Sequence, residues 1–132
     1  MKVFLADDDL LLRVGLRLAL NYKQDVEVIG EAGDGLSAIE KIRADTPDIS
    51  LIDIDMPILS GIEVIRTVRK TSSHMKIIAF SNHANQDCVK KALEAGANGY
   101  VPKSIEIDEL FSIMEAFYKG LRIISPYLIG VV

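Results

Sequence analysis

Five short apolar runs alternate with five segments of helical period along the 132-residue chain. Most of the runs are apolar on successive residues, which is typical of strands buried on both faces of a parallel sheet. The runs are Val3–Ala6, Val26–Ile29, Ile49–Ile52, Lys76–Phe80 and Asn98–Val101. The helical segments are Leu10–Asn21, Leu36–Ala44, Gly61–Lys70, Ala84–Ala95 and Ile107–Lys119. A strict strand–helix alternation of this kind requires right-handed crossover connections.

The alternation predicts an α/β fold with (βα)5 connectivity, in which helices cover both faces of a doubly wound sheet. For five parallel strands the common arrangement is the flavodoxin-like order 2-1-3-4-5, and ligands bind where the order reverses, between strands 1 and 3. Any chemistry of this chain is therefore expected at the carboxyl ends of those two strands.

Acidic residues follow both of these strand ends. Asp7, Asp8 and Asp9 come directly after the first apolar run, and Asp53 ends the third. Because Asp9 precedes the first helical segment, we expect it to cap that helix. Several carboxylates in one crevice repel each other, and a hard divalent cation relieves the repulsion. The sequence predicts a Mg²⁺ site formed by Asp7, Asp8 and Asp53, with Asp53 also placed to act as a nucleophile.

Polar residues also follow the fourth and fifth runs. Ser81 comes after the fourth run, and Lys103 comes after Val101-Pro102. Taken alone, Ser81 is typical of a turn and Lys103 of a solvated surface. Together, a hydroxyl and an ammonium group beside a carboxylate cluster are what phosphoryl transfer to an aspartate needs.

The third strand is followed by a sequence that favours a turn and then a helix. Pro57 favours a turn, and Ser60-Gly61-Ile62-Glu63 fits a capping box. This pattern places Asp53 at the carboxyl end of a strand, just before a loop.

Composition limits the function classes. The chain has the length of one domain, with 49% hydrophobic residues, a net charge of −4 and a pI near 5.1. The overall acidic balance excludes a chain-wide basic surface for nucleic acid. The only cysteine, Cys88, cannot form an internal disulfide. Asp7-Asp8-Asp9 interrupts the N-terminal apolar run, which excludes a signal peptide there, and no segment has the length of a membrane span. We expect a cytoplasmic protein without a membrane partner.

The motifs occur in a fixed order along the chain. They are Asp7-Asp8, Asp53, Met56-Pro57, Gly61, Ser81, Tyr100 and, three residues later, Lys103. In order and spacing they resemble the response-regulator receiver domain of two-component signalling, over about residues 2 to 120. Further segments resemble the NarL/FixJ subfamily, whose members usually carry a LuxR-type helix-turn-helix DNA-binding domain after the receiver. These segments are residues 30–35, 81–83 and 95–100 and the tail from Gly120 to Pro126.

The resemblance implies a role for each matching residue. Asp53 would accept the phosphoryl group from a sensor histidine kinase, with Mg²⁺ held by the side chains of Asp8 and Asp53 and the backbone carbonyl of Asp55. Asp7 would assist directly or through water. Ser81 and Lys103 would contact the phosphoryl oxygens, and Tyr100 would be the switch aromatic that turns inward as Ser81 moves. The resemblance implies a phosphoacceptor signalling domain, which promotes its own phosphorylation and dephosphorylation but is not classed as an enzyme.

Two more residues lie where they could tune the lifetime of the phosphoryl group. His83 follows Ser81 by two positions, and the side chain of Asp55 lies two positions beyond the acceptor. An exposed loop histidine with no such role is the alternative for His83.

Residues 1–120 are expected to form the receiver domain and residues 121–132 an apolar tail or the start of a linker to an output domain. The implied output surface is strand 4, helix 4, strand 5 and helix 5, or helices 1 and 5. A homodimer could form through helices 1 and 5 or through the face of helix 4, strand 5 and helix 5. DNA would be bound only through a C-terminal domain outside this chain. A stand-alone receiver that acts as a protein-interaction module stays open as an alternative.

Two other classes compete with this interpretation. Gly33-Asp34-Gly35-Leu36-Ser37-Ala38 formally matches a dinucleotide-binding loop, but it follows the second strand and leaves Lys103 unexplained. Its glycines are better explained by a tight turn. Asp53-Ile54-Asp55 matches the motif of aspartyl-phosphate phosphatases of the haloacid dehalogenase type, which normally ends the first strand of a longer chain. Neither class explains the full set of residues.

Overall fold

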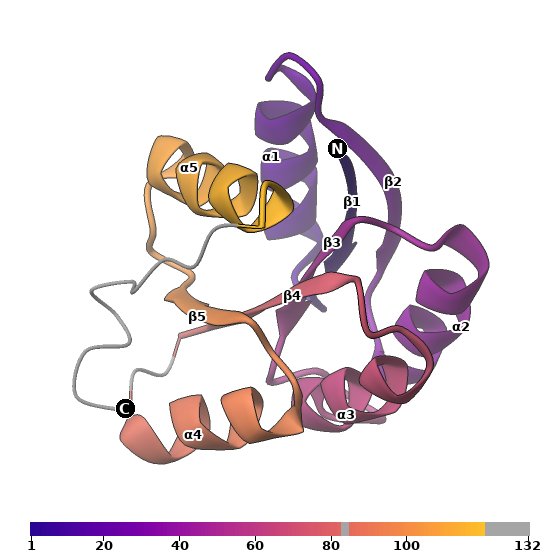
Figure 1. Ribbon diagram of the computed structural model, residues 1–132. Helices are drawn as coiled ribbons and strands as arrows, with labels where there is room; N and C mark the ends of the chain where they lie inside the picture. The colour runs from indigo at the N-terminus through magenta and orange to yellow at the C-terminus, as the bar shows by residue number, and fades with distance from the viewer. Residues whose placement is uncertain (83–84, 121–132) are drawn as a thin grey trace.

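Five parallel strands form one sheet in the order β2-β1-β3-β4-β5 in the computed structural model, which describes residues 1–82 and 85–120 (Figure 1). The predicted fold and strand order are confirmed. The strands are β1 (Lys2–Ala6), β2 (Glu27–Ala32), β3 (Ile49–Asp53), β4 (Lys76–Ser81) and β5 (Gly99–Pro102). The helices are α1 (Leu10–Asn21), α2 (Gly35–Asp45), α3 (Gly61–Thr71), α4 (Gln86–Ala95) and α5 (Ile107–Tyr118).

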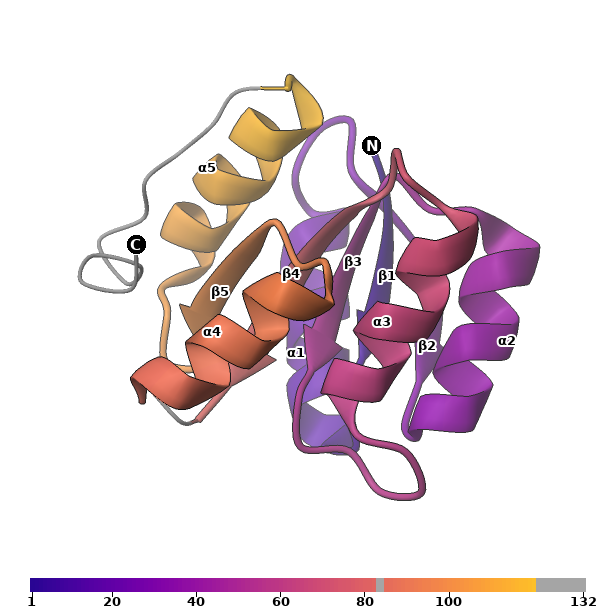
Figure 2. The same ribbon diagram turned by 60° about the horizontal axis from the view of Figure 1, so that its bottom comes forward.

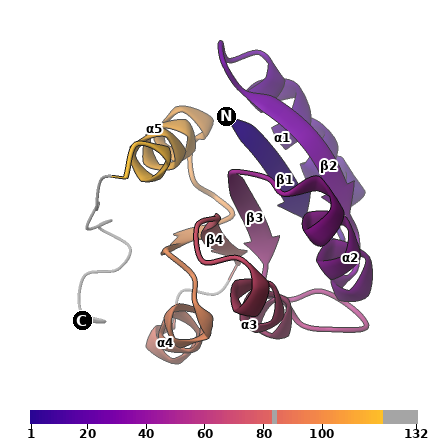
Figure 3. The ribbon, with the colours of Figure 1, turned by 45° about the vertical axis from the view of Figure 1, so that its right-hand side comes forward.

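The helices form two layers, one on each face of the sheet. Helices α1 and α5 lie on one face and α2, α3 and α4 on the other, as the three ribbon views show together (Figures 1, 2 and 3). Successive strand residues point to opposite faces, so each strand supplies both layers. Val3 and Leu5 belong to the core under α1 and α5, whereas Phe4 and Ala6 belong to the core under α2, α3 and α4. This double burial explains why the strands are apolar on successive residues.

The edge strand β2 extends further than its apolar run. The sequence predicts an end at Ile29, but the pairing with β1 continues through Gly30 to Ala32. Gly30 allows this because a Cβ there would lie 2.9 Å from the Phe4 ring. The absence of a side chain at Gly30 makes room for Phe4 of the neighbouring strand. The apolar pattern of the sequence does not predict this contact.

The helix N-termini carry the expected caps. The side chain of Asp9 accepts a hydrogen bond from the backbone N–H of Leu12 at 3.1 Å, which confirms its capping role. The Ser60 hydroxyl accepts from the N–H of Glu63 at 3.4 Å. The carboxylate of Glu63 contacts Arg66 one turn along the helix. These caps fix where α1 and α3 begin, directly after the acidic ends of β1 and β3.

Among residues 1–82 and 85–120, no helix combines the length and the apolar character that a membrane crossing would require. Two predictions concern other residues: His83 and the apolar tail at 121–132 lie outside the described part of the chain.

Candidate functional site

Three carboxylates converge at the carboxyl edge of the sheet. Asp7 and Asp8 follow β1 and Asp53 ends β3, and these two strands are neighbours. One oxygen from each of the three carboxylates lies within 4.8 Å of the others. Asp7 and Asp53 are buried, while Asp8 is exposed and faces solvent. The predicted convergence of residues far apart in sequence is therefore found in the structure.

Neighbouring backbone groups fix the position of the Asp53 side chain. Its side chain is 1% exposed, and its Oδ1 accepts a hydrogen bond from the backbone N–H of Asp55 at 3.0 Å. Helix α3 begins directly against it, because a Cβ on Gly61 would lie 2.0 Å from the Asp53 carbonyl oxygen. Gly61 is needed here for close approach, so that the loop of residues 54–60 can return to the end of its own strand.

Lys103 brings a positive charge between the two buried acids. Its Nζ lies 2.8 Å from Oδ2 of Asp7 and 3.1 Å from Oδ2 of Asp53. The backbone N–H of Lys103 donates to the carbonyl of Ser81 at 2.8 Å, which ties the end of β5 to the end of β4. Lys103 is thus a buried ion-pair partner, and its side chain is only 13% exposed.

Burial and the neighbouring charges shift the pKa of Asp53 and of Lys103. Burial raises the pKa of Asp53, and the nearby Asp7 charge adds to this, although the Asp55 N–H and Lys103 act in the opposite direction. For Lys103, burial by itself lowers the pKa, but the hydrogen bonds and charges of Asp7 and Asp53 outweigh it and raise the pKa. The pair therefore consists of an ammonium group that is firmly protonated and a carboxylate whose ionised form is disfavoured by its surroundings.

Ser81 ends β4, and Tyr100 lies on the neighbouring strand β5. Ser81 is fully buried and Tyr100 is 2% exposed. Burial raises the pKa of the Tyr100 phenol, and a side-chain hydrogen bond with Ser81 lowers it by less. The aromatic ring therefore points inward, packed in the core under α2, α3 and α4.

The donor set suits a hard divalent cation. Three carboxylates carry three negative charges against one ammonium group, and oxygen ligands of this kind are those that Mg²⁺ takes in proteins. Asp8 is exposed, which leaves room for water or phosphate oxygens at the open side. Asp55, two residues beyond Asp53, is also exposed.

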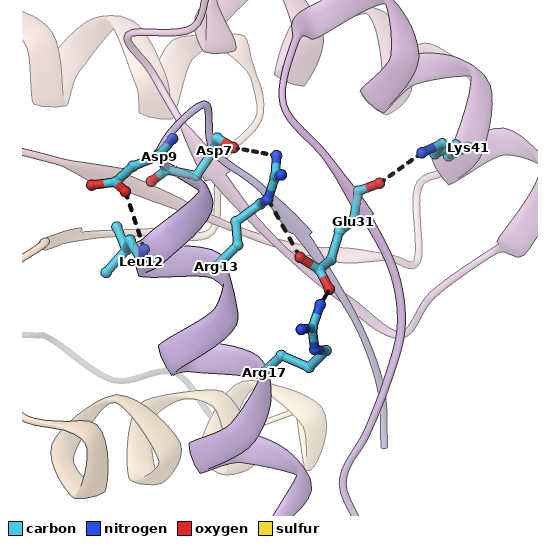
Figure 4. A network of polar contacts seen from close by, with 7 residues as sticks. All are labelled: Asp7, Asp9, Leu12, Arg13, Arg17, Glu31 and Lys41. Carbon is cyan, nitrogen blue, oxygen red and sulfur yellow. Dashed lines mark hydrogen bonds and ion pairs between the residues drawn. The ribbon is translucent and has the colours of Figure 1, made fainter.

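Sequence reasoning missed the basic residues behind the cluster. Arg13 donates from Nη1 to the carbonyl of Asp7 at 2.8 Å, and its Nε lies 3.3 Å from Glu31 Oε1 (Figure 4). Arg13 and Arg17 are the only charged residues of α1 and stand four positions apart, on the same side of the helix. That isolated pair in an apolar helix is the signal that would have identified them.

Comparison with known proteins identifies the family. The sequence profile of the response regulator receiver domain matches residues 3–115. This chain belongs to the response regulator receiver domain family. Receiver domains are signalling domains of two-component systems, and the strand order and the acidic cluster described above agree with this assignment.

Relatives and solved structures support the same family. The receiver chain is 34% identical over 128 residues to the transcriptional regulatory protein YvfU of Bacillus subtilis, covering 97% of this chain and 64% of that protein. It is 33% identical over 125 residues to the response regulator UvrY of Escherichia coli K12, covering 95% and 57%. The receiver chain thus spans about three fifths of the length of these curated relatives.

Two crystal structures show how close the receiver fold is. A LuxR-family two-component response regulator from Aurantimonas superposes with a TM-score of 0.88 at 36% identity, covering 95% of this chain and 89% of that one. The response regulator domain of Thermotoga maritima CheB superposes with a TM-score of 0.79 at 26% identity, covering 96% and 98%.

Proposed function

We propose that this receiver domain accepts a phosphoryl group on the carboxylate of Asp53, in a Mg²⁺-dependent reaction with a sensor histidine kinase as donor. The observation that carries the proposal is the placement of Lys103, whose ammonium contacts both buried acids at 2.8 and 3.1 Å. An ammonium fixed beside a buried carboxylate is positioned to meet the charge that develops on phosphoryl oxygens.

The transfer is a substitution at phosphorus. A carboxylate oxygen of Asp53 forms the new P–O bond while the P–N bond of the donor phosphohistidine breaks, and the electron pair of that bond stays on the imidazole. The product is an acyl phosphate, which water later hydrolyses. Bound Mg²⁺ supplies positive charge to the phosphoryl oxygens. In our proposal Asp8, Asp53 and the Asp55 carbonyl hold the ion, with Asp7 in support.

Lys103 and Ser81 then bind the phosphoryl oxygens. Because Lys103 leaves its present contacts with Asp7 and Asp53 to do so, phosphorylation breaks ion pairs that now hold β5 against β1 and β3. The Ser81 hydroxyl is coupled to Tyr100 by the side-chain hydrogen bond already noted. We propose that this coupling makes Tyr100 the switch aromatic, so that phosphorylation shifts the population of states at α4, β5 and α5.

The relatives suggest the purpose of the switch. YvfU is described as a transcriptional regulatory protein, and the Aurantimonas structure as a LuxR-family response regulator. We propose that the full protein controls transcription through a DNA-binding domain that follows the receiver. His83 and the Asp55 side chain are proposed to tune dephosphorylation.

We propose that an apolar surface on α1 binds a second copy of the receiver. Leu11, Leu18 and Tyr22 are 82%, 66% and 91% exposed, and they recur on one side of α1. A hollow of about 280 Å³ lies between α1 and the start of α5, lined by Leu16, Ile107 and other apolar residues. Sedimentation of wild type and Leu18→Glu, each with and without a beryllofluoride phosphoryl mimic, tests this. A mimic-induced dimer on α4, β5 and α5 would survive Leu18→Glu.

Intact-mass spectrometry tests the central proposal. The protein is incubated with Mg²⁺ and acetyl phosphate, with and without a chelator, alongside Asp53→Asn and the control Asp9→Asn, which keeps a helix-capping side chain. We expect one phosphoryl group on wild type and on the Asp9 variant, none on the Asp53 variant, and none with chelator. Labelling that persists in Asp53→Asn would refute the assignment of the acceptor. Repeated turnover of a phosphomonoester would instead support the phosphatase alternative.

A further inference from the structure

Arg13 holds the peptide that joins the two acids directly after β1. Its Nη1 donates to the carbonyl oxygen of Asp7 at 2.8 Å, and this oxygen belongs to the peptide bond between Asp7 and Asp8 (Figure 4). A hydrogen bond to its oxygen restrains the rotation of this planar unit, and the orientation of the plane influences the directions in which the two flanking side chains leave the backbone. The contact therefore acts on both acids, although Arg13 touches neither carboxylate.

The other polar atoms of Asp7 are held from different elements. Its N–H donates to the carbonyl of Ala32 on β2 at 3.0 Å, and its Oδ1 accepts from the N–H of Asp9 at 2.9 Å. Its Oδ2 lies 2.8 Å from Lys103. With the Arg13 contact, the backbone and carboxylate of Asp7 are fixed at both ends. Because Asp7 is fixed in this way, the backbone that precedes Asp8 is rigid, and the exposed Asp8 side chain can reach a cation from it.

Arg13 itself is positioned before any ligand binds. Its Nε lies 3.3 Å from Glu31 Oε1, Arg17 contacts the second oxygen of Glu31, and Lys41 donates to the Glu31 carbonyl at 2.9 Å (Figure 4). The Arg13 side chain is only 15% exposed. A guanidinium can serve Glu31 and the Asp7 carbonyl together because its planar fork presents several N–H groups in fixed directions.

Gly33 provides the space that the guanidinium occupies. A Cβ at this position would lie 2.7 Å from Arg13 Nη1, closer than a side chain can approach. Within the described residues, the glycines with positive φ are Gly96 and Gly120, so Gly33 is not there for a left-handed turn. The close approach of a side chain from α1 is therefore a reason for glycine at this position besides the turn predicted from the sequence.

We propose that Arg13 is a positioning residue for the acidic site, which sets the direction of the Asp7 and Asp8 carboxylates for binding a divalent cation by holding the peptide between them. The inference rests on the proposed Mg²⁺-dependent function. Groups that orient metal ligands from outside the coordination shell typically change metal affinity by about 10- to 100-fold.

The sign of the effect separates positioning from simple electrostatics. Arg13 is a cation close to a cation site, so removing its charge alone would strengthen Mg²⁺ binding. Loss of positioning would weaken it. Arg17 is the matched control, because Arg17→Ala removes the same charge and also breaks a contact with Glu31, but Arg17 does not bond to Asp7. Gly33→Ala gives a second route, since it displaces the guanidinium without removing any charge.

The experiment measures the dissociation constant of Mg²⁺ alone by isothermal titration calorimetry, for wild type, Arg13→Ala, Gly33→Ala and Arg17→Ala. Circular dichroism and thermal unfolding without metal check that each variant is folded. We expect Arg13→Ala and Gly33→Ala to bind Mg²⁺ about 10-fold more weakly or worse. Arg17→Ala should match wild type or bind slightly more tightly.

Several results would overturn the inference: unchanged or tighter binding in Arg13→Ala, an equal loss in Arg17→Ala, or a wild type that binds no Mg²⁺. If Arg13→Ala does not fold, Gly33→Ala decides alone, and unchanged affinity in that variant overturns it. Labelling of wild type by acetyl phosphate is scored separately. A wild type that binds Mg²⁺ but is never labelled refutes the proposed phosphorylation, while the ranking of dissociation constants still decides the role of Arg13.

Discussion

At the carboxyl edge of the sheet, three carboxylates lie around one ammonium group, whereas at the amino edge one guanidinium lies among carbonyl oxygens. Arg69, on α3, is the centre of the amino edge. It donates to the carbonyls of Gly96, Ser72 and Met75 and to Asn98 Oδ1, over distances of 2.6 to 3.0 Å. These groups lie at the end of α4 and immediately before β4 and β5.

The two edges differ in what they are arranged to do. Arg69 donates to several carbonyl oxygens at a helix end and at strand starts, and these contacts favour the folded state. Asp7 and Asp53 are buried next to each other, and like charges at short distance oppose folding. One edge is therefore arranged for stability, while the other keeps a repulsion between buried acids that a bound cation would relieve.

The largest expected effect is from Lys103→Ala in the absence of metal. This change leaves Asp7 and Asp53 buried without their cation, and breaking a buried pair on one side typically costs about 3 to 5 kcal/mol. Urea unfolding at pH 7 measures it. Adding Asp53→Asn should restore much of the loss, because it removes one of the two unpaired charges. If the double variant is as unstable as Lys103→Ala, repulsion between the acids is not the cause.

Arg69→Ala should come next, with a loss of about 3 kcal/mol, since several part-buried carbonyls lose a donor together. Urea unfolding compares it with Arg66→Ala, one turn earlier on α3, which removes an exposed ion pair to Glu63. Exposed ion pairs contribute about 0.5 kcal/mol or less, so the free energy of unfolding of the control should be close to that of the wild type. Equal losses in the two variants would show that the amino edge has no special stabilising role.

Magnesium should stabilise the wild type by a smaller amount. At a free concentration about ten times its dissociation constant, linkage predicts about 1.4 kcal/mol. Thermal and urea unfolding with and without Mg²⁺ measure this. We expect the gain to disappear in Asp53→Asn and to persist in Arg69→Ala if that variant folds. A gain of equal size in Asp53→Asn would place the cation elsewhere.

The smallest expected effect is from Asp53→Asn at pH 7 without metal, which should raise the free energy of unfolding by about 1 kcal/mol. The reason is that the variant removes a buried ionised group and leaves Lys103 paired with Asp7. Burial holds the pKa of Asp53 above 3.8. Between 3.8 and the raised pKa the folded wild type binds more protons than the unfolded chain, so its stability falls as the pH rises through this window. The gap between variant and wild type should therefore widen as the pH rises above 3.8, and then stay constant. Unfolding curves that show a gap closing with rising pH would contradict the raised pKa.

The sequence by itself determined the fold class, the strand order and the acids of the site. Apolar runs of successive residues require burial on both faces, and the (βα)5 alternation then leaves one common order, which brings the ends of β1 and β3 together. Asp7, Asp8, Asp53 and Lys103 could be assigned to one edge of the sheet because strand ends are a property of local pattern. Their convergence follows from the topology alone.

Only the tertiary structure decided which groups hold those acids in place. Long side chains that cross between elements make these contacts: Arg13 reaches Asp7 and Glu31, and Arg69 reaches Gly96. No periodicity in the sequence specifies where the end of such a side chain lies. The glycines show the same limit. Gly30, Gly33 and Gly61 look alike in sequence, yet one admits an aromatic ring, one a guanidinium and one a backbone carbonyl. Packing in three dimensions determines each of these roles, because the neighbour that needs the space comes from a distant part of the chain.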